Sequence, residues 1–331
     1  MRVAVVDIGS NSVQLLVAEI DDGQWRQLAA AERVTRLAEG LGSGQALDPG
    51  AAGRTFEAVE GLADLARKLG AERLWAVGTR SFRLARDGRA FAARLKDVIG
   101  ERVEILSEER EAELGFEGAV FGLGCVRGRV LSIDIGGGST EIVSGHDGRP
   151  LDRVSLPFGA VVLTEQYLGR DPSPPEDVAA LRAAVFDAVS TTDLIRRYLD
   201  DDEPHGPLIG SGGTLVTLAA MAAGLEAYRA DVVHGSSLAR NVLRAQCADL
   251  AARSITERKS IRGLGAGRAP TILAGAVVAD VLVDVTGAET IVVSDHGLRH
   301  AVLRERLLAL GLETRGVAWD RRHRAANGSL N

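Results

Sequence analysis

The stretch Arg2-Val3-Ala4-Val5-Val6-Asp7-Ile8-Gly9-Ser10-Asn11-Ser12 recurs 127 positions later as Arg129-Val130-Leu131-Ser132-Ile133-Asp134-Ile135-Gly136-Gly137-Gly138-Ser139. Arg, Val, Asp, Ile, Gly and Ser coincide in the two copies without a gap. Each copy begins with an apolar run typical of a strand, passes through a turn of Gly and Ser, and resumes in a second run at residues 13–20 or 141–144. We interpret each copy as a β-hairpin and the two copies as an internal repeat.

The two turns differ from the common nucleotide-binding loops. P-loop and dinucleotide-binding motifs pass from a strand through glycines into a helix, whereas β-branched residues here indicate a strand on both sides of the turn. The chain contains no GxxxxGK[ST] sequence.

Glycines at a hairpin tip allow backbone N–H groups to approach an anion closely, and phosphate fits such a tip. Asp7 and Asp134, at the strand ends, would repel a phosphate unless a divalent cation lies between them. The paired tips therefore predict Mg²⁺ together with a chain of phosphates. The alternative, that Asp-Ile-Gly only forms a tight turn, is favoured for one copy but not for two.

Length and composition exclude several classes of protein. The 331 residues correspond to about two domains, and 46% apolar with 25% charged residues is typical of a globular chain. A net charge of −6 gives no global attraction to nucleic acid or to an anionic membrane. Aromatic residues, at 4%, are few for stacking on bases. We therefore expect neither nucleic acid nor a membrane as a partner.

The first residues give an expectation about location. Met1 to Val6 run directly into Asp7, which leaves no room for the apolar stretch of a secretory signal. The longest apolar run, residues 269–279, is too short to cross a bilayer. We expect a cytoplasmic protein, in which Cys125 and Cys247 are small buried hydrophobes.

Beyond the hairpins, strands and helices alternate as in a layered α/β fold. Asp48 and Pro49 supply the cap and first-turn proline of a helix that should end at Leu69, and Ser107 should cap another. Further strands are expected at residues 73–77, 103–106, 207–209 and 290–293, and further helices at 91–99, 160–168, 175–199, 241–252, 270–285 and 297–310. We place one domain at residues 1–125, a second at 126–312, and a flexible, solvated tail at 313–331.

A third glycine turn, Gly210-Ser211-Gly212-Gly213-Thr214, passes from a strand into a helix. The first backbone amides of that helix could hold an anion or a polar group. A simple tight turn between strand and helix is an equal alternative.

With these motifs, the chain resembles the exopolyphosphatase and guanosine pentaphosphate phosphohydrolase family, a branch of the superfamily of actin, sugar kinases and chaperone ATPases. The resemblance covers nearly the whole chain. It rests on five motifs in the family's order, namely residues 7–12, residues 134–141, Leu156-Pro157-Phe158-Gly159-Ala160, residues 210–214, and Arg268-Ala269-Pro270 before Ala274-Gly275. It implies two ribonuclease-H-like domains with the active cleft between them, in a short form that lacks extra C-terminal helical domains.

The resemblance also implies roles for single residues. The phosphate-binding tips correspond to Gly9, Ser10 and Asn11 and to Gly136, Gly137, Gly138, Ser139 and Thr140. The metal carboxylates correspond to Asp134 and Glu141, and Asp7 would hold a metal-bound water or orient the nucleophile. Arg83 takes the place of an arginine that grips phosphate, for which a planar guanidinium is suited. Arg80 stands where the family usually has a small residue, and we expect it to face solvent rather than to add a phosphate contact.

The family's catalytic glutamate falls in a disturbed motif, residues 107–114. Alignment on Ala112 and Leu114 makes Glu111 the candidate base, and Glu109 remains a rival. A carboxylate within reach of a water can orient that water and take its proton. Without the family, the four glutamates of this helix would be interpreted as a solvated face.

Two histidines follow late in the chain. His300 stands where relatives commonly have Glu, and we expect it to alter a contact at the start of its helix. His296, beside Asp295, is expected to satisfy a local hydrogen bond rather than to bind a metal.

The resemblance implies a Mg²⁺-dependent exopolyphosphatase that releases the terminal phosphate of inorganic polyphosphate by direct attack of water. Hydrolysis of guanosine pentaphosphate (pppGpp) at the same site is the nearest alternative. An ATP-dependent kinase of the superfamily and a nucleotide-binding protein without catalysis are alternatives of other classes, although no acceptor site or adenosine pocket is recognisable. The sequence leaves a homodimer open.

Overall fold

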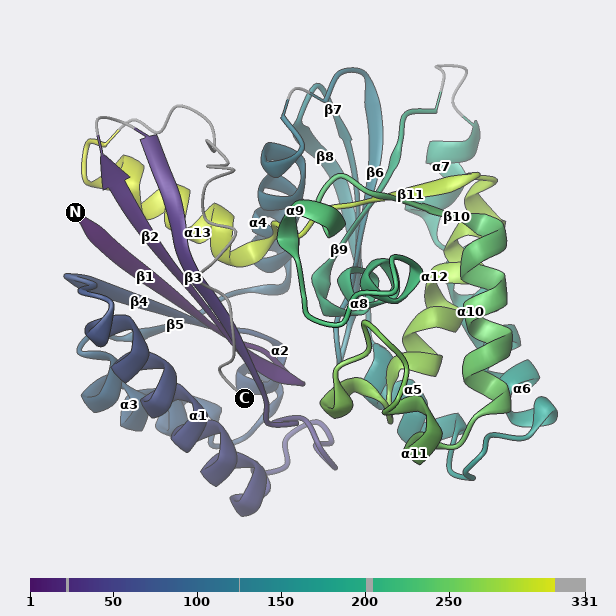
Figure 1. Ribbon diagram of the computed structural model, residues 1–331, viewed down its shortest axis with the longest axis horizontal. Coiled ribbons are helices and arrows are strands. Elements are labelled where there is room, and N and C mark those ends of the chain that lie inside the picture. Colours follow the sequence, from purple (N-terminus) through teal and green to yellow (C-terminus); the bar gives the residue numbers. More distant parts are fainter. Residues whose placement is uncertain (22–23, 125, 201–204, 313–331) are drawn as a thin grey trace.

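The computed structural model describes residues 1–21, 24–124, 126–200 and 205–312. It contains two β-sheets, each with its own helices, which lie next to each other (Figure 1). Cys125 and the predicted tail at 313–331 lie outside the described residues. No helix in the described part of the chain is long and apolar enough to cross a membrane.

The first sheet has the strand order β3-β2-β1-β4-β5 and the second β10-β11-β9-β6-β7-β8. The strands of the first sheet are β1 (Arg2–Ile8), β2 (Ser12–Asp21), β3 (Gln24–Val34), β4 (Arg73–Gly78) and β5 (Val103–Ile105). Those of the second are β6 (Arg129–Ile135), β7 (Thr140–His146), β8 (Arg149–Leu156), β9 (Leu208–Ser211), β10 (Ser237–Ala239) and β11 (Thr290–Val293).

The two sheets repeat one topology. β1 lies between antiparallel β2 and parallel β4, and β6 lies between antiparallel β7 and parallel β9. β3 and β8 extend the antiparallel side, while β5 and β11 extend the parallel side. Both predicted hairpins are therefore confirmed, and the repeat extends over five strands of each sheet.

Neither β3 nor β8 was predicted from the sequence pattern. β3 lies at the edge of its sheet and is mostly half-buried, and its run of alanines has low strand propensity. β8, also at an edge, alternates exposed and half-buried residues without a strong apolar face.

The helices of the first half cover one face of the first sheet. They are α1 (Pro49–Lys68), α2 (Arg80–Leu84) and α3 (Gly88–Ile99). The Asp48 carboxylate accepts a hydrogen bond from the Ala51 N–H, as expected of a cap. Apolar side chains of α1, α3 and the strands form one core between helices and sheet.

The second half carries more helices. They are α5 (Ala160–Tyr167), α6 (Pro175–Ser190), α7 (Asp193–Asp200), α8 (Gly212–Ala222), α9 (Ala230–Val233), α10 (Arg240–Ala252), α11 (Ile255–Arg258) and α12 (Ile272–Thr286), with a short 3₁₀ helix at Ala266–Arg268. The single long helix predicted to reach Leu199 is wrong, because α6 ends before Thr191 and α7 begins anew at Asp193. The hydroxyls of Thr191 and Thr192 bond to carbonyls at the end of α6, and such bonds compete with helix continuation. Cys247 is half-buried against the core rather than fully buried.

Two helices pack across the two halves. α4 (Glu108–Gly122) shares a core with residues of β6, β7 and β9 in the second sheet, and α13 (Leu298–Ala309) shares one with β1 and β2 in the first. α4 and α13 also pack on each other closely, since a Cβ at Gly118 would lie 2.1 Å from the Gly297 carbonyl oxygen. The division at residues 1–125 and 126–312 remains a prediction, because these two helices tie the halves together.

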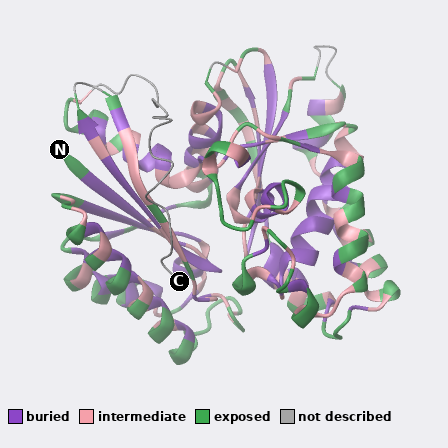
Figure 2. Ribbon diagram, viewed as in Figure 1, coloured by how far each residue is buried: buried purple, intermediate pink, exposed green. Residues whose placement is uncertain are grey.

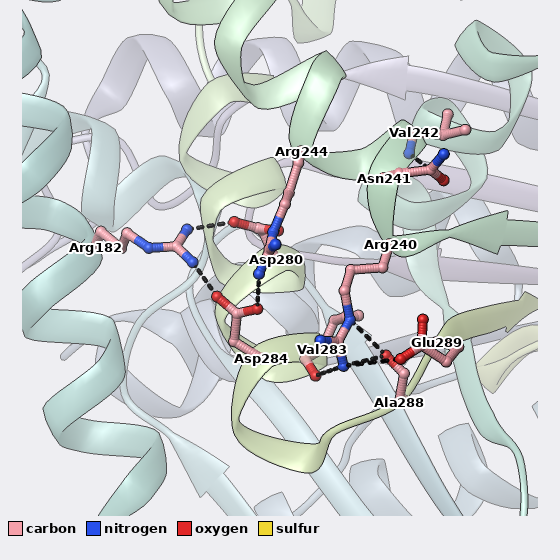
Figure 3. Close-up of polar contacts among 10 residues, drawn as sticks. All are labelled: Arg182, Arg240, Asn241, Val242, Arg244, Asp280, Val283, Asp284, Ala288 and Glu289. Atoms are coloured by element: carbon pink, nitrogen blue, oxygen red, sulfur yellow. Dashed lines mark hydrogen bonds and ion pairs between the residues drawn. The ribbon is translucent and has the colours of Figure 1, made fainter.

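Helix α12 is rich in apolar residues, and its residues 272–283 are all buried in the core of the second half (Figure 2). Its Asp280 is 3% exposed and forms an ion pair with Arg182 of α6. Arg182 and Arg244 of α10 also pair with Asp284, one turn further along α12 (Figure 3). These contacts hold α12 between its two neighbouring helices.

We predict that Asp280→Asn destabilises the protein. The exchange removes a charge that two arginines contact, and we expect the free energy of unfolding to fall by about 1–3 kcal/mol. Denaturant unfolding measures the change. Asp249→Asn is the control, because Asp249 pairs with Arg253 on the exposed side of α10 and should matter by less than about 1 kcal/mol. Equal stability of wild type and Asp280→Asn would refute the structural role.

Candidate active site

The tips of both hairpins line one cavity of about 500 Å³ between the two halves. Both hairpin tips thus lie at the cleft between the two halves, where the resemblance places the active site. The predicted site residues that line it are Asp7, Gly9, Ser10, Asn11, Glu111, Asp134, Gly136, Gly137, Gly138, Ser139 and Glu141. Gly212, Gly213 and Thr214, from the third glycine turn at the start of α8, line it as well.

Two predicted phosphate contacts lie elsewhere. Thr140 is fully buried, and its hydroxyl donates a hydrogen bond to the Phe158 carbonyl at 2.8 Å. Arg83 is not among the cavity-lining residues, and its guanidinium is engaged with Glu111. A phosphate contact for either residue remains a prediction.

The two tips have the same turn and touch each other. The Gly9 N–H donates to the Ser12 carbonyl, and the Gly136 N–H donates to the Ser139 carbonyl, both at 3.0 Å. A Cβ at Gly137 would lie 2.7 Å from the Asn11 Cβ. Only glycine permits so close an approach, which explains the glycine at this position of the second tip.

Sheet register brings two carboxylates together. Asp134 of β6 is the direct cross-strand partner of Glu141 of β7, so both side chains leave the hairpin on the same face. In the first repeat, Asp7 pairs in the same way with Gln14. One repeat thus presents two carboxylates to the cavity, and the other a carboxylate and an amide.

Burial and mutual repulsion perturb these acids. Burial, aided by the charge of Glu111, raises the pKa of Asp7 to about 7. Burial with repulsion from Glu111 and Asp134 raises the pKa of Glu141 to about 8. Burial also raises the pKa of Asp134. Carboxyls crowded in this way favour either a proton or a cation between them.

Serine hydroxyls orient two of the three carboxylates. The Ser211 hydroxyl donates to Asp134 at 3.2 Å, and the Ser155 hydroxyl donates to Glu141 at 3.1 Å. The Oδ1 atom of Asp7 is buried without a hydrogen-bond partner among the described residues. A buried acceptor without a partner is costly unless a ligand or water satisfies it.

Glu111 reaches the cavity from the first turn of α4, where Ser107 caps the helix as predicted by accepting from the Arg110 N–H. Its side chain is 14% exposed and accepts a hydrogen bond of 2.6 Å from Arg83, which also donates to the Leu106 carbonyl. Burial raises the pKa of Glu111, and the charge of Arg83 opposes this. Glu109 is exposed and lies outside the cavity wall. The geometry therefore gives Glu111 access to a ligand in the cavity, while its catalytic role remains a prediction.

Contrary to the expectation from the sequence, Arg80 does not face solvent. Its side chain is 15% exposed and lies against Gly138, where a Cβ would be 3.1 Å from the Arg80 Cδ. Arg80 is the first residue of the short helix α2, and the next two residues, Ser81 and Phe82, are buried. Their burial fixes the position of Arg80.

Other cavity residues were missed by the sequence analysis. Arg268 forms an ion pair with Glu32, and both residues line the cavity. Burial raises the pKa of Glu32 and Asp134; the charge of Arg268 opposes this at both and helps to bring the pKa of Glu32 below its usual value. Arg299 also faces the cavity. Glu32 could not be found because β3 was not predicted, whereas Arg268 belongs to a motif for which no role had been assigned.

The two late histidines form a buried stack. The rings of His296 and His300 lie 3.9 Å apart between centroids and are nearly parallel. Burial holds the pKa of His300 well below its usual value, so the ring is neutral. His300 Nδ1 accepts from the Gly297 N–H just before α13. That this contact differs from the one in relatives stays a prediction.

The carboxylates suit a hard divalent cation. No three acidic, histidine or cysteine side chains in the described ranges come together as a complete metal cage. Mg²⁺ does not require one, because it usually binds through one or two carboxylates with waters and substrate phosphates. The unpartnered Asp7 oxygen and the raised pKa values of Asp134 and Glu141 fit this mode of binding.

The pKa values predict how the stability of the metal-free protein depends on pH. At pH 6.5 the folded protein carries most of the protons on Asp7 and Glu141, whose pKa values are about 7 and 8, and it gives up most of the Asp7 proton and about half of the Glu141 proton by pH 8, whereas the unfolded chain has already lost both. The folded state binds more protons than the unfolded state, so stability must fall as pH rises through this window, by about 2 kcal/mol. Denaturant unfolding at several pH values, in the presence of a chelator, measures this change. Asp7→Asn should flatten the slope, and a stability that rises from pH 6.5 to 8 would contradict the assignment.

The chain is similar to proteins of one known family. The model of the Ppx/GppA phosphatase family matches residues 16–310. Exopolyphosphatase 2 of Mycobacterium tuberculosis is 31% identical over 316 residues, which cover 90% of this chain and 96% of that protein.

Two solved structures show the same architecture. The Ppx/GppA family member of Aquifex aeolicus superposes with a TM-score of 0.77 at 30% identity, over 94% of this chain and 98% of the other. An exopolyphosphatase from Cytophaga hutchinsonii superposes with a TM-score of 0.83 over 95% of this chain and 99% of the other, and at 23% identity it supports the fold alone. The expected pair of ribonuclease-H-like halves, as in the actin-like superfamily, agrees with these neighbours and with the repeated sheets.

Proposed function

Because the chain belongs to the Ppx/GppA phosphatase family, we propose that it is a phosphoanhydride hydrolase, an exopolyphosphatase that releases the terminal phosphate of inorganic polyphosphate. One observation supports this proposal above the others. The glycine tips of both repeats and four largely buried carboxylates, Asp7, Glu111, Asp134 and Glu141, face a single cavity.

The tips would hold the last phosphates of the chain through backbone N–H groups and the hydroxyls of Ser10 and Ser139. Glu111 would orient a water in line with the terminal anhydride bond and accept its proton as the water oxygen attacks phosphorus. The bond to the bridging oxygen then breaks, and the shortened chain leaves with that oxygen. Arg83 would position the Glu111 carboxylate through its 2.6 Å hydrogen bond.

We propose Mg²⁺ as the cofactor. Asp134 and Glu141 would hold it, and Asp7 would hold a water bound to it or orient the attacking water. When bound, Mg²⁺ would neutralise phosphate charge that these carboxylates otherwise repel.

The test is a set of parallel phosphate-release assays with polyphosphate, pppGpp and ATP, with and without Mg²⁺. We expect the highest kcat/KM on polyphosphate. Preference for pppGpp would assign the family's other named activity instead. Phosphate transfer from ATP to an added acceptor, without hydrolysis of polyphosphate, would overturn the proposal in favour of a kinase.

A further inference from the structure

A second cavity lies behind the hairpin tips, and the proposed reaction does not use it. It has a volume of about 300 Å³ and shares Ser10 and Gly138 with the active-site cavity. Its other walls come from residues 38–43 after β3, from α2, and from α5 of the opposite half. We call it the rear cavity.

Arg80 supplies a positive charge to the wall of the rear cavity. Its guanidinium makes no hydrogen bond to any residue that the structure describes, although only 15% of the side chain is exposed. The nearest acid is Glu108, whose Oε1 lies 3.8 Å from Arg80 Nη1, beyond hydrogen-bond length. The guanidinium nitrogens of Arg80 are not among the fully buried polar atoms of the described residues, so a ligand with acceptor oxygens can reach them from the rear cavity.

Hydroxyl groups form the inner end of the rear cavity. Ser10 and Ser81 are 7% and 1% exposed, and the Ser81 hydroxyl donates to the Ser10 hydroxyl at 2.9 Å. Glu165 and Gln166 of α5 are exposed and therefore form its rim. A forked cation beside small hydroxyl-bearing residues matches the oxygens of a phosphate group. The acidic rim disfavours a long polyanion, which would pass close to Glu165.

We propose that the rear cavity binds orthophosphate through Arg80. This rests on the proposed function, which makes orthophosphate the product released beside Ser10 and Gly138. A polyphosphate chain is a second possible ligand, because it would present the same kind of phosphate oxygens to Arg80. The acidic rim at Glu165 disfavours a long chain of phosphates, so we assign the site to the free ion.

The test is product inhibition. Orthophosphate in the active-site cavity competes with polyphosphate, whereas orthophosphate in the rear cavity does not, so the wild type should show a noncompetitive component. Arg80→Ser removes the charge-assisted bonds and should raise the inhibition constant of that component about 10-fold or more, with the KM for polyphosphate unchanged. Arg80→Lys keeps the charge and should recover part of the effect. Arg89→Ser, an exposed arginine of α3, is the matched control and should change nothing.

A rise in the KM for polyphosphate without a change in the noncompetitive component would refute orthophosphate as the occupant. The same would follow if Arg80→Ser and wild type were inhibited alike. Calorimetric titration with inorganic phosphate, without polyphosphate, separates this proposal from the proposed function. Arg80→Ser should lack a binding event that wild type and Arg89→Ser retain, even if no polyphosphate is hydrolysed. Identical titrations of all three proteins would overturn the rear site.

Discussion

Glu111→Gln is expected to reduce phosphate release from polyphosphate by about 10²–10⁴-fold, the usual contribution of a positioned general base. Glutamine keeps the shape and can still accept the hydrogen bond from Arg83, so the position of α4 should not change. It cannot take a proton from water. Steady-state kinetics measure the loss, and polyphosphate binding by the variant should persist or tighten because a negative charge leaves the cavity.

Glu109→Gln is the matched control for this prediction. Glu109 lies on the same helical turn but is exposed and outside the cavity, so its exchange should be mild. If Glu109→Gln abolished turnover while Glu111→Gln did not, the alignment through this disturbed motif would be wrong by two residues. If neither variant mattered, α4 would not carry the base.

Asp134→Asn should weaken the response to Mg²⁺ by at least about 10–100-fold and lower the rate at every Mg²⁺ concentration. Asp134 is the cross-strand partner of Glu141, and the exchange removes one of the two carboxylates that this hairpin presents. Asparagine fits the space beside Gly212 and can still accept from Ser211. Activity titrated with Mg²⁺ gives the apparent affinity.

Asp295→Asn provides the comparison for Asp134→Asn. Asp295 lines the same cavity, and the charge of Arg299 and a hydrogen bond with Tyr228 lower the pKa that burial raises. The Asp295→Asn exchange should leave the Mg²⁺ response close to that of wild type. Equal Mg²⁺ responses of Asp134→Asn and wild type would remove Asp134 from the metal site.

The sequence predicts the centre of the fold well because the repeat carries its own structural signals. Strands β1 and β6 are short, mainly apolar runs, and their glycine turns mark the tips, so both hairpins could be predicted from the residues, while the cleft between the halves followed from the resemblance. The edge strands β3 and β8 lack such a signal. Glu32, on β3, could not be placed for that reason.

Side-chain contacts between distant segments could not be predicted from the sequence. The family motif implies that Arg83 grips phosphate, whereas the structure pairs it with Glu111, a contact over 28 positions that no spacing rule predicts. Arg80 was expected in solvent because the family usually has a small residue at this position, yet the close approach of Gly138 from the other half covers it. Such contacts depend on how the two halves meet, and a local pattern does not encode that.

The central claim is that water attacks the terminal phosphate of a chain held between the two hairpin tips. Hydrolysis of polyphosphate of defined length in ¹⁸O-labelled water, followed by ³¹P NMR, tests it most directly. We predict orthophosphate as the released product, with one labelled oxygen in each molecule, a Mg²⁺ requirement, and loss of the signal in Glu111→Gln. Unlabelled phosphate, or fragments cut from the interior of the chain, would contradict the account.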